Sequence, residues 1–262
     1  MSDATLSTVR NAARLLKAFL TREEELGVAE LSRRLGLGKS SVHRLLTTLL
    51  GEGLVEQDAR TGRYRLGIVM FELGEAVRLH MDLHGAAATV LLQLREETGE
   101  SVQLGVAHGD DVIYVERLDS AHTLRLLGEP GRRAPLYCTS SGKVLLAFRS
   151  DPERADYLAR VRLTPLTRHT ITDPVQLRGE LKTVRARGWA EAINERQVGT
   201  ASLAAPVRDL NGSVVAALSV NASVSRFRGV PRRRLAQTVT EAAAAVSRRL
   251  GWAPEHAHRK ES

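Results

Sequence analysis

The side chains with the most distinctive chemistry lie on one side of a helix expected over residues 39–50. At about 100° per residue, the apolar residues of this segment share one arc and are expected to pack against other helices. They are Val42, Leu45, Leu46, Leu49 and Leu50. The opposite side carries only cations and short hydrogen-bonding groups, namely Lys39, Ser40, Ser41, His43, Arg44, Thr47 and Thr48. Such groups suit phosphate oxygens and base edges, so the pattern predicts a DNA-binding helix, whereas an ordinary solvated helix would be expected to include acids.

A hairpin expected after this helix supplies two further cations. Its strands are expected over residues 54–57 and 63–66, around a turn at residues 58–62. Arg60 and Arg63 lie near the tip, from which a wing beside a DNA-binding helix could reach a phosphate or the minor groove. The alternative is a hairpin that only covers the hydrophobic core.

The preceding segments place the DNA-binding helix in a larger motif. Two helices are expected over residues 8–20 and 28–35, and Gly36 and Gly38 supply the turn before residue 39. Three short helices with glycine in the second connection are typical of a helix-turn-helix. With the hairpin, residues 6–67 are therefore expected to form a winged helix-turn-helix domain.

Residues 68–84 are expected to form a linker helix. Its apolar positions are spread over more than one face, which favours contact with a second subunit and predicts a homodimer. His80 and His84 are spaced so that they could share a metal ion on one helix, but no cysteine or suitably spaced acid completes the set. We therefore expect surface or interface histidines, no metal and no cofactor.

Beyond residue 85 strands and helices alternate, which predicts an α+β domain over residues 85–252 with a mostly antiparallel sheet. Strands are expected over residues 101–107, 112–118, 123–127, 189–194, 202–208 and 214–220. Helices are expected over residues 91–97, 141–147, 176–187 and 231–250.

Polar residues of this second domain predict a small-molecule pocket. Ser219 and Asn221 alternate with apolar neighbours, so they face the other side of their strand, where either solvent or a pocket accounts for them. Ser140 and Ser141 open a helix, whose exposed backbone N–H groups could bind an anion. The alternative is that these two serines only cap the helix.

Composition and charge limit the function classes. The 262 residues are 43% hydrophobic and 26% charged, as in ordinary globular proteins. The net charge of +8 favours a polyanionic partner, although an arginine-rich proteome would give the same excess. The only cysteine is Cys138, which excludes an intrachain disulfide and a cysteine-based zinc finger. No signal-peptide pattern and no apolar run of about 18 residues is present, so we expect a cytoplasmic protein without a membrane partner.

An enzyme is the main alternative of a different class. The segment Ser140-Ser141-Gly142-Lys143 resembles part of a phosphate-binding loop, but Val144 follows the lysine and position 137 is not glycine. No base is marked beside Cys138, and no Gly-x-Ser-x-Gly elbow occurs. We therefore expect no catalytic residues. A further alternative is an architectural DNA-binding protein without an effector, against which the large second domain argues.

The order of several motifs resembles that of the IclR-type transcriptional regulators. In the first domain the similar segments are residues 31–37 (LSRRLGL), 39–49 (KSSVHRLLTTL) and 64–67 (YRLG). In the second domain they are residues 141–147 (SGKVLLA), 188–190 (GWA), 204–207 (AAPV) and 216–220 (AALSV), with Glu195 and Gly199. Together the similarities extend from residue 6 to about residue 250, which is more specific than a lone helix-turn-helix.

The resemblance implies a winged helix-turn-helix, a dimerisation linker and an effector-binding domain related to the GAF/profilin-like fold. Family members bind double-stranded operator DNA as dimers or tetramers and respond to small metabolites, often carboxylates or aromatic acids. It therefore implies an effector-controlled regulator, which we expect to be a repressor. The pocket residues implied by the motifs are Ser140, Ser141, Thr200, Ser202, Ser219 and Asn221, with Leu124 and Leu126 as an apolar wall. Where some carboxylate-sensing relatives carry an acid or amide, residues 192–194 offer only Asn194.

Overall fold

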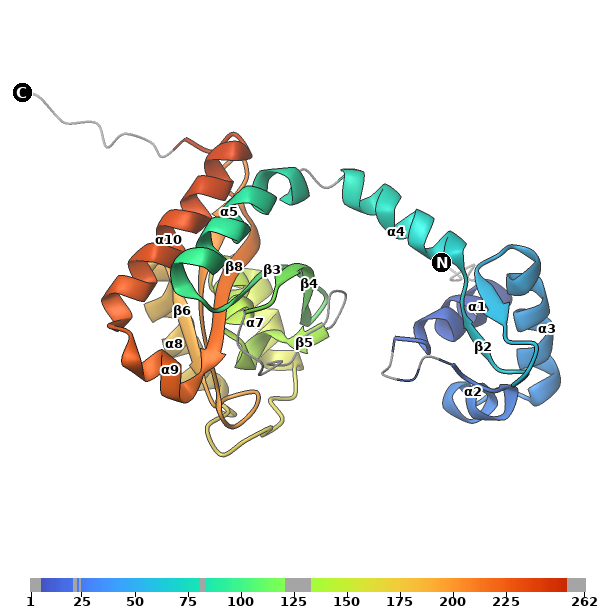
Figure 1. Ribbon diagram of the computed structural model, residues 1–262. Helices are drawn as coiled ribbons and strands as arrows, with labels where there is room; N and C mark the ends of the chain where they lie inside the picture. Colours follow the sequence, from blue (N-terminus) through green and yellow to red (C-terminus); the bar gives the residue numbers. More distant parts are fainter. Residues whose placement is uncertain (1–5, 21–22, 24, 81–82, 121–132, 254–262) are drawn as a thin grey trace, which may run out of the picture. The chain divides into compact units, whose positions relative to one another are not determined.

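The computed structural model describes residues 6–20, 23, 25–80, 83–120 and 133–253. The chain divides into two compact units, Met1–Met81 and Asp82–Ser262, each with its own hydrophobic core (Figure 1). The two units are described separately below.

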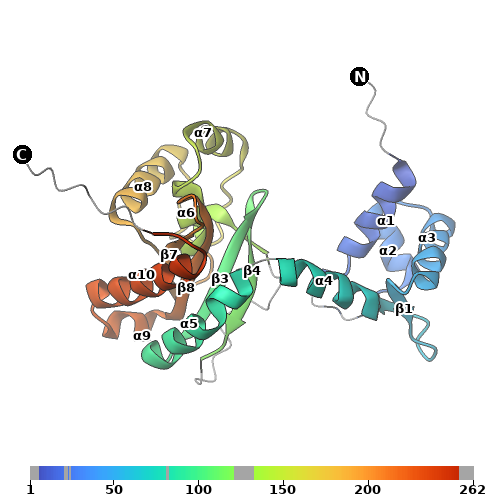
Figure 2. The same cartoon turned by 90° about the horizontal axis from the view of Figure 1, so that it is seen from above.

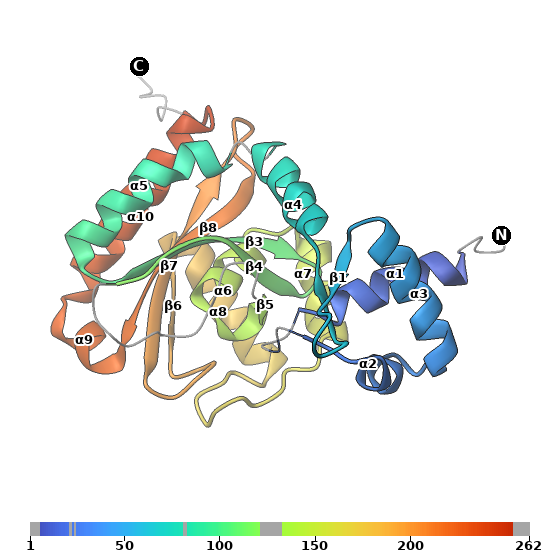
Figure 3. The same ribbon diagram turned by 45° about the vertical axis from the view of Figure 1, so that its right-hand side comes forward.

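Three short helices form the body of the first unit: α1 (Ser7–Lys17), α2 (Val28–Leu35) and α3 (Lys39–Gly51) (Figure 3). Leu31, Val42 and Leu46 are fully buried among them. Gly36 ends α2 with a φ of 68°, a left-handed conformation that costs glycine little because it has no Cβ. The first helix ends at Lys17 and not at the expected residue 20, because residues 18–20 form a turn that leaves Leu20 exposed.

A hairpin of β1 (Val55–Gln57) and β2 (Tyr64–Leu66) follows α3, and α4 (Ile68–His80) follows the hairpin. Tyr64 also pairs with Leu26, which joins the hairpin to the segment before α2. A Cβ at Gly67 would lie 2.1 Å from the carbonyl oxygen of Gly53. Glycine is therefore required where the chain passes from the hairpin into α4.

The prediction of a single linker helix over residues 68–84 is wrong in one respect. The helix α4 ends at His80, and α5 (Leu83–Thr98) begins three residues later, so His80 and His84 belong to different helices. His84 contacts Glu116 through its Nδ1 atom. His84 therefore has a partner within the second unit. Within the described ranges no group of three or more histidines, cysteines or acids could hold a metal ion.

The second unit is built on one antiparallel sheet with the strand order β5-β4-β3-β8-β7-β6. Its strands are β3 (Ser101–His108), β4 (Asp111–Leu118), β5 (Arg133–Pro135), β6 (Ala190–Ile193), β7 (Thr200–Arg208) and β8 (Val214–Ser223). The central pair joins β3 to β8, with Gln103 opposite Ser219 and Ser101 opposite Asn221. The α+β class and antiparallel sheet predicted from the sequence are confirmed.

Helices cover both faces of this sheet. The helices α5, α9 (Val224–Gly229) and α10 (Arg232–Arg249) lie on one side, whereas α6 (Ser140–Ala147), α7 (Asp151–Arg160) and α8 (Pro174–Arg187) lie on the other (Figure 2). Along β8, Leu218 and Val220 therefore pack under α5 and α10. Ser219 and Asn221 face the opposite side because side chains alternate along a strand.

Several elements were not expected from the sequence. The helix α7 buries only Tyr157 and Leu158, too few residues for an apolar period, but a capping box of Ser150 and Glu153 marks its start. The short elements β5 and α9 also show no repeat of apolar residues by which they could have been predicted. The strand expected over residues 123–127 lies outside the described residues. No helix in the described part of the chain is long and apolar enough to cross a membrane.

Candidate functional site

The outer side of α3 is a continuous exposed surface. The seven residues of this helix that were predicted to face DNA are all exposed: Lys39, Ser40, Ser41, His43, Arg44, Thr47 and Thr48. Val42, Leu46 and Leu49 face the core, as expected from the helical spacing. Leu50 differs from the expectation, since it is 41% exposed at the edge of the apolar arc, one residue before the helix ends.

On this surface the threonine hydroxyls donate within the helix, whereas the two cations are left available to a partner. The hydroxyls of Thr47 and Thr48 donate to the carbonyl oxygens of His43 and Arg44, at 2.9 and 3.1 Å. Their oxygen lone pairs remain available to accept. Among the described contacts, the charged groups of Lys39 and Arg44 have no ion-pair partner, so both cations are available to a ligand.

The wing presents one available cation where two were expected. Asp58 shapes the turn by accepting from the backbone N–H groups of Arg60 and Thr61, and the Thr61 bond in particular lowers the pKa of the Asp58 carboxyl. The Arg60 side chain is exposed at the tip. Arg63, by contrast, donates to the Glu25 carbonyl and pairs with Glu30, because it lies at the base of the turn beside α2.

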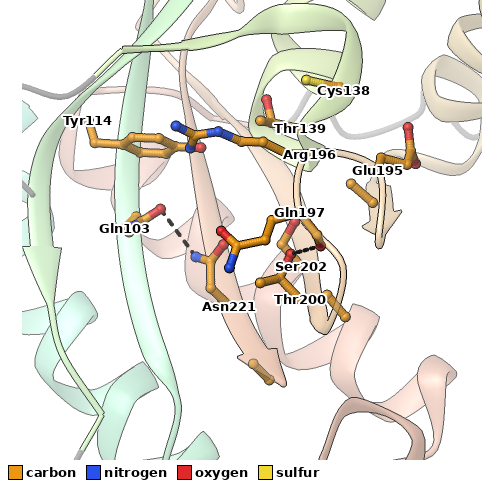
Figure 4. A pocket seen from close by; sticks show the side chains of 13 residues that line it. Gln103, Tyr114, Cys138, Thr139, Glu195, Arg196, Gln197, Thr200, Ser202 and Asn221 are labelled. Atoms are coloured by element: carbon orange, nitrogen blue, oxygen red, sulfur yellow. Dashed lines mark hydrogen bonds between the residues drawn. The ribbon is translucent and has the colours of Figure 1, made fainter. Parts of the chain in front are cut away.

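A pocket in the second unit lies between the sheet, on the side that carries α6, and the loop that joins β6 to β7 (Figure 4). Thr200, Ser202 and Asn221, three of the residues expected to bind an effector, line it. Asn221 donates through Nδ2 to Gln103 Oε1 and to Ser219 Oγ, both at 3.3 Å, and Ser140 donates to Ser202 at 2.8 Å. Five of the expected effector residues thus come together at one place. Leu124 and Leu126 lie outside the described residues.

The start of α6 differs from both sequence interpretations. The N-cap is Thr139, whose Oγ1 accepts from the Gly142 N–H at 3.0 Å, so Ser140 and Ser141 are not the cap. Both serines are buried, and a Cβ at Gly142 would lie 2.2 Å from the Leu136 carbonyl oxygen. The helix start is therefore packed against the preceding turn, and its N–H groups are not an exposed anion site.

Ten of the thirteen lining residues were absent from the predicted set. They are Gln103, Tyr114, Cys138, Thr139, Ala192, Glu195, Arg196, Gln197, Ala201 and Ala222. Alternation along the strand expected over residues 101–107 could have placed Gln103 on the pocket side of the sheet. Arg196 and Gln197 lie in a loop, where no regular repeat of residues indicates which way a side chain points. Burial raises the pKa of the Cys138 thiol to about 12, so it stays protonated near neutral pH and is a poor nucleophile.

A buried ion pair holds the pocket loop. Lys143 is 2% exposed, and its Nζ atom donates to Glu195 Oε1 at 2.5 Å and to the Glu191 carbonyl at 3.2 Å. Thr170 donates to the backbone carbonyl of Glu195 at 2.6 Å. Burial raises the pKa of the Glu195 carboxyl, and the charge of Lys143 opposes that rise. Lys143 therefore anchors the loop between β6 and β7, and its ammonium group is not free to bind a phosphate.

Both units match known protein families. Residues 8–59 match the IclR helix-turn-helix domain, and residues 75–248 match the domain described as bacterial transcriptional regulator IclR C-terminal. The HTH-type transcriptional regulator KdgR of Escherichia coli is 34% identical over 248 residues, which cover 95% of this chain and 94% of that protein. The glycerol operon regulatory protein of Streptomyces griseus is 36% identical over 251 residues, or 94% and 97% of the two chains.

Solved structures show the same relationship. A putative IclR transcriptional regulator from Silicibacter sp. TM1040 superposes with a TM-score of 0.83 at 31% identity, covering 95% of this chain and 98% of that chain. An IclR homolog from Microbacterium hydrocarbonoxydans, complexed with 4-hydroxybenzoate, has a TM-score of 0.83 at 26% identity and covers 93% and 99%.

Proposed function

Since the chain belongs to the IclR family of bacterial transcriptional regulators, we propose that it is a repressor whose operator binding is controlled by a small effector. The winged helix-turn-helix binds double-stranded operator DNA, and the pocket of the second unit binds the effector. An architectural protein without an effector is not favoured, because the second unit carries the family's effector domain.

The exposed side of α3 is the observation that carries this proposal. It has two cations without an ion-pair partner among the residues that the structure describes, four hydroxyl groups and no acid along residues 39–48. Arginine can bind guanine O6 and N7 with two hydrogen bonds, whereas hydroxyls bind phosphates or either kind of base edge. We therefore assign base contact to Arg44 and phosphate contact to Lys39 and to Arg60 of the wing.

Replacement of Arg44 tests the assignment. On an operator selected from a random-sequence pool, Arg44→Ala is expected to lose about 1–3 kcal/mol of binding free energy, because a bidentate base contact is removed. Arg44→Lys should recover non-specific binding but not preference for the selected sequence, because lysine keeps the charge and lacks the planar fork. Titration by fluorescence anisotropy measures both.

Arg178→Ala is the matched control, since Arg178 is an exposed arginine of α8 in the other unit and the substitution removes the same charge. If Arg44→Ala binds the selected operator as tightly as Arg178→Ala, the assignment of α3 is wrong.

We also propose that the active form is a homodimer or tetramer, since one winged helix covers too little DNA for tight specific binding. Three apolar residues support α4 as the contact: Ile68, Phe71 and Leu73 are 63%, 64% and 53% exposed. Phe71→Glu is expected to convert the protein to monomers in light scattering, whereas Glu72→Gln on the same helix should not. A wild-type protein that is monomeric at micromolar concentration, with and without DNA, would refute this.

The effector residues we propose are Ser140, Thr200, Ser202, Ser219 and Asn221, to which the lining position of Gln103 adds a sixth. A ligand in this pocket can release DNA only if it binds two arrangements of the oligomer with different affinities. That a relative was solved with 4-hydroxybenzoate supports a small organic ligand.

A further inference from the structure

A second cavity of this unit lies on the other side of the sheet from the effector pocket. It is enclosed by the end of α5, by α9 and by the start of α10, three helices that cover the same side of the sheet (Figure 2). Its volume is about 290 Å³, close to the lower end of the range for small-molecule sites. Of the residues that line it, only Ala222 of β8 also lines the effector pocket. This α9 cavity is therefore a separate site, and the DNA and effector contacts proposed above do not involve it.

The floor of the α9 cavity is apolar. Four buried residues form it, namely Val220 and Ala222 of β8, Phe227 of α9 and Leu235 of α10. Val230, in the connection between α9 and α10, also lines the cavity and is 41% exposed. Covering this apolar surface with an apolar group is favourable because the surface is removed from water. The floor therefore suits an aliphatic side chain or a ring.

One wall of the cavity is held by an ion pair. Arg226 of α9 donates to Glu100 through Nε at 2.7 Å and through Nη2 at 2.9 Å. The two parallel bonds join α9 to the segment that follows α5, and each charge neutralises the other. These two side chains therefore shape the cavity, and their charges are not available to a ligand.

Two further charges line the cavity, and both side chains are exposed. Glu97 of α5 accepts from the Thr238 hydroxyl at 3.2 Å and has no ion pair among the described residues. Arg234 of α10 has neither a hydrogen bond nor an ion pair within the described part of the chain. Thr238 follows Arg234 by four residues on one helix, so their Cβ atoms are about 5–6 Å apart. An acid and a guanidinium thus lie about one helical turn apart at the rim, and each is available to a ligand.

We propose that the α9 cavity binds an amino acid with an apolar side chain. The ammonium group pairs with Glu97, the carboxylate pairs with Arg234, and the side chain covers Phe227 and Leu235. A zwitterion meets both rim charges, whereas an amine or an acid of the same shape meets only one and a neutral apolar molecule meets neither. This inference goes beyond the proposed function, because it adds a second ligand site and its test does not depend on operator binding.

Amino acids and their analogues with a single charge test the ligand class on the full-length protein. Isothermal titration calorimetry compares L-leucine with 3-methylbutylamine and 4-methylpentanoate, and L-phenylalanine with phenethylamine and 3-phenylpropanoate. At least one amino acid is expected to bind, and both of its analogues should bind about 5- to 20-fold more weakly, since one charge-assisted contact is lost at an exposed rim. L-Serine should bind more weakly than that amino acid, because it covers little apolar surface.

Two variants test the rim residues. Glu97→Gln is expected to lower affinity for the amino acid by about 5- to 20-fold while leaving that for its acid analogue unchanged. Arg234→Gln should lower affinity for the amino acid by a similar factor while leaving that for its amine analogue unchanged. Glu96→Gln and Arg233→Gln are the matched controls, because these exposed neighbours carry the same charges and do not line the cavity. Thermal melting checks that each variant is folded.

Arg196→Gln locates the binding site, because Arg196 lines the effector pocket and not the α9 cavity. This variant should bind the amino acid as the wild type does. If it loses as much affinity as Arg234→Gln, the amino acid occupies the effector pocket and the second site is refuted. If the wild type binds neither amino acid, or binds serine equally well, the ligand class is refuted. If the rim variants are indistinguishable from their controls, the roles of Glu97 and Arg234 are refuted.

Discussion

The exposed side of α3 and the pocket of the second unit both present arginines that have no carboxylate partner among the described residues, but they are built in different ways. The α3 surface consists of neighbours on one helix, all of them exposed. The pocket collects residues from β3, β4, β6, β7, β8 and two connecting segments, and its loop is held by a buried ion pair. Water and salt screen charges on the first surface, whereas charges in an enclosed site interact more strongly.

This difference predicts how each site tolerates substitution. On α3, the proposed phosphate contacts would be shared among several cations and hydroxyls, so the loss of one residue is expected to weaken binding without abolishing it. In the pocket, each charged side chain is stabilised by a single partner, either another residue of the protein or a bound ligand. The largest effects of single substitutions are therefore expected around the pocket, and they should include stability as well as binding.

The most damaging substitution is expected to be Lys143→Met. It leaves the Glu195 carboxylate buried without its ion-pair partner, which typically costs about 3–5 kcal/mol of unfolding free energy. Urea unfolding followed by tryptophan fluorescence measures this cost, since both tryptophans, Trp189 and Trp252, lie in the second unit. The double variant Lys143→Met/Glu195→Met should recover much of the loss, because no unpaired charge remains buried.

An exposed pair gives the control for that experiment. Arg185 and Asp151, whose side chains are 53% and 84% exposed, should contribute less than about 1 kcal/mol, so Arg185→Gln should unfold nearly as the wild type does. Equal costs for Lys143→Met and Arg185→Gln would remove the proposed contrast between enclosed and exposed charges.

The pH dependence sharpens the same comparison. Burial raises the pKa of Glu195 in the folded state above its ordinary value of 4.5, so its contribution to stability is present below that value and is lost as pH rises through the raised pKa. Lys143 opposes the rise, and its removal should enlarge this loss. The destabilisation by Lys143→Met, relative to wild type, is therefore expected to be smaller at pH 4.5 than at pH 7.

The two sites also differ in how far the sequence predicts them. The α3 surface follows from a local helical repeat, and only the edge residue Leu50 departs from it. Along β8, alternation places Ser219 and Asn221 on one side, but their contact with Gln103 depends on the pairing of β3 with β8 across more than 100 residues. Arg196 lies in a loop, and neither period nor propensity indicates where its side chain points. Long-range pairing and loop conformation are therefore what the sequence does not reveal.

The smallest expected effects lie in the wing, where two arginines three residues apart differ in their partners. Arg60 is exposed at the tip, and Arg60→Gln should weaken DNA binding on all sequences by a similar factor and reduce the slope of log affinity against log salt by about 1. Arg63 is paired with Glu30, so Arg63→Gln should change the salt slope less. Anisotropy titrations at several salt concentrations measure both slopes. If Arg63→Gln has the larger effect, DNA must displace Glu30 from Arg63, and available charge would then be a poor guide to the DNA-binding residues of this protein.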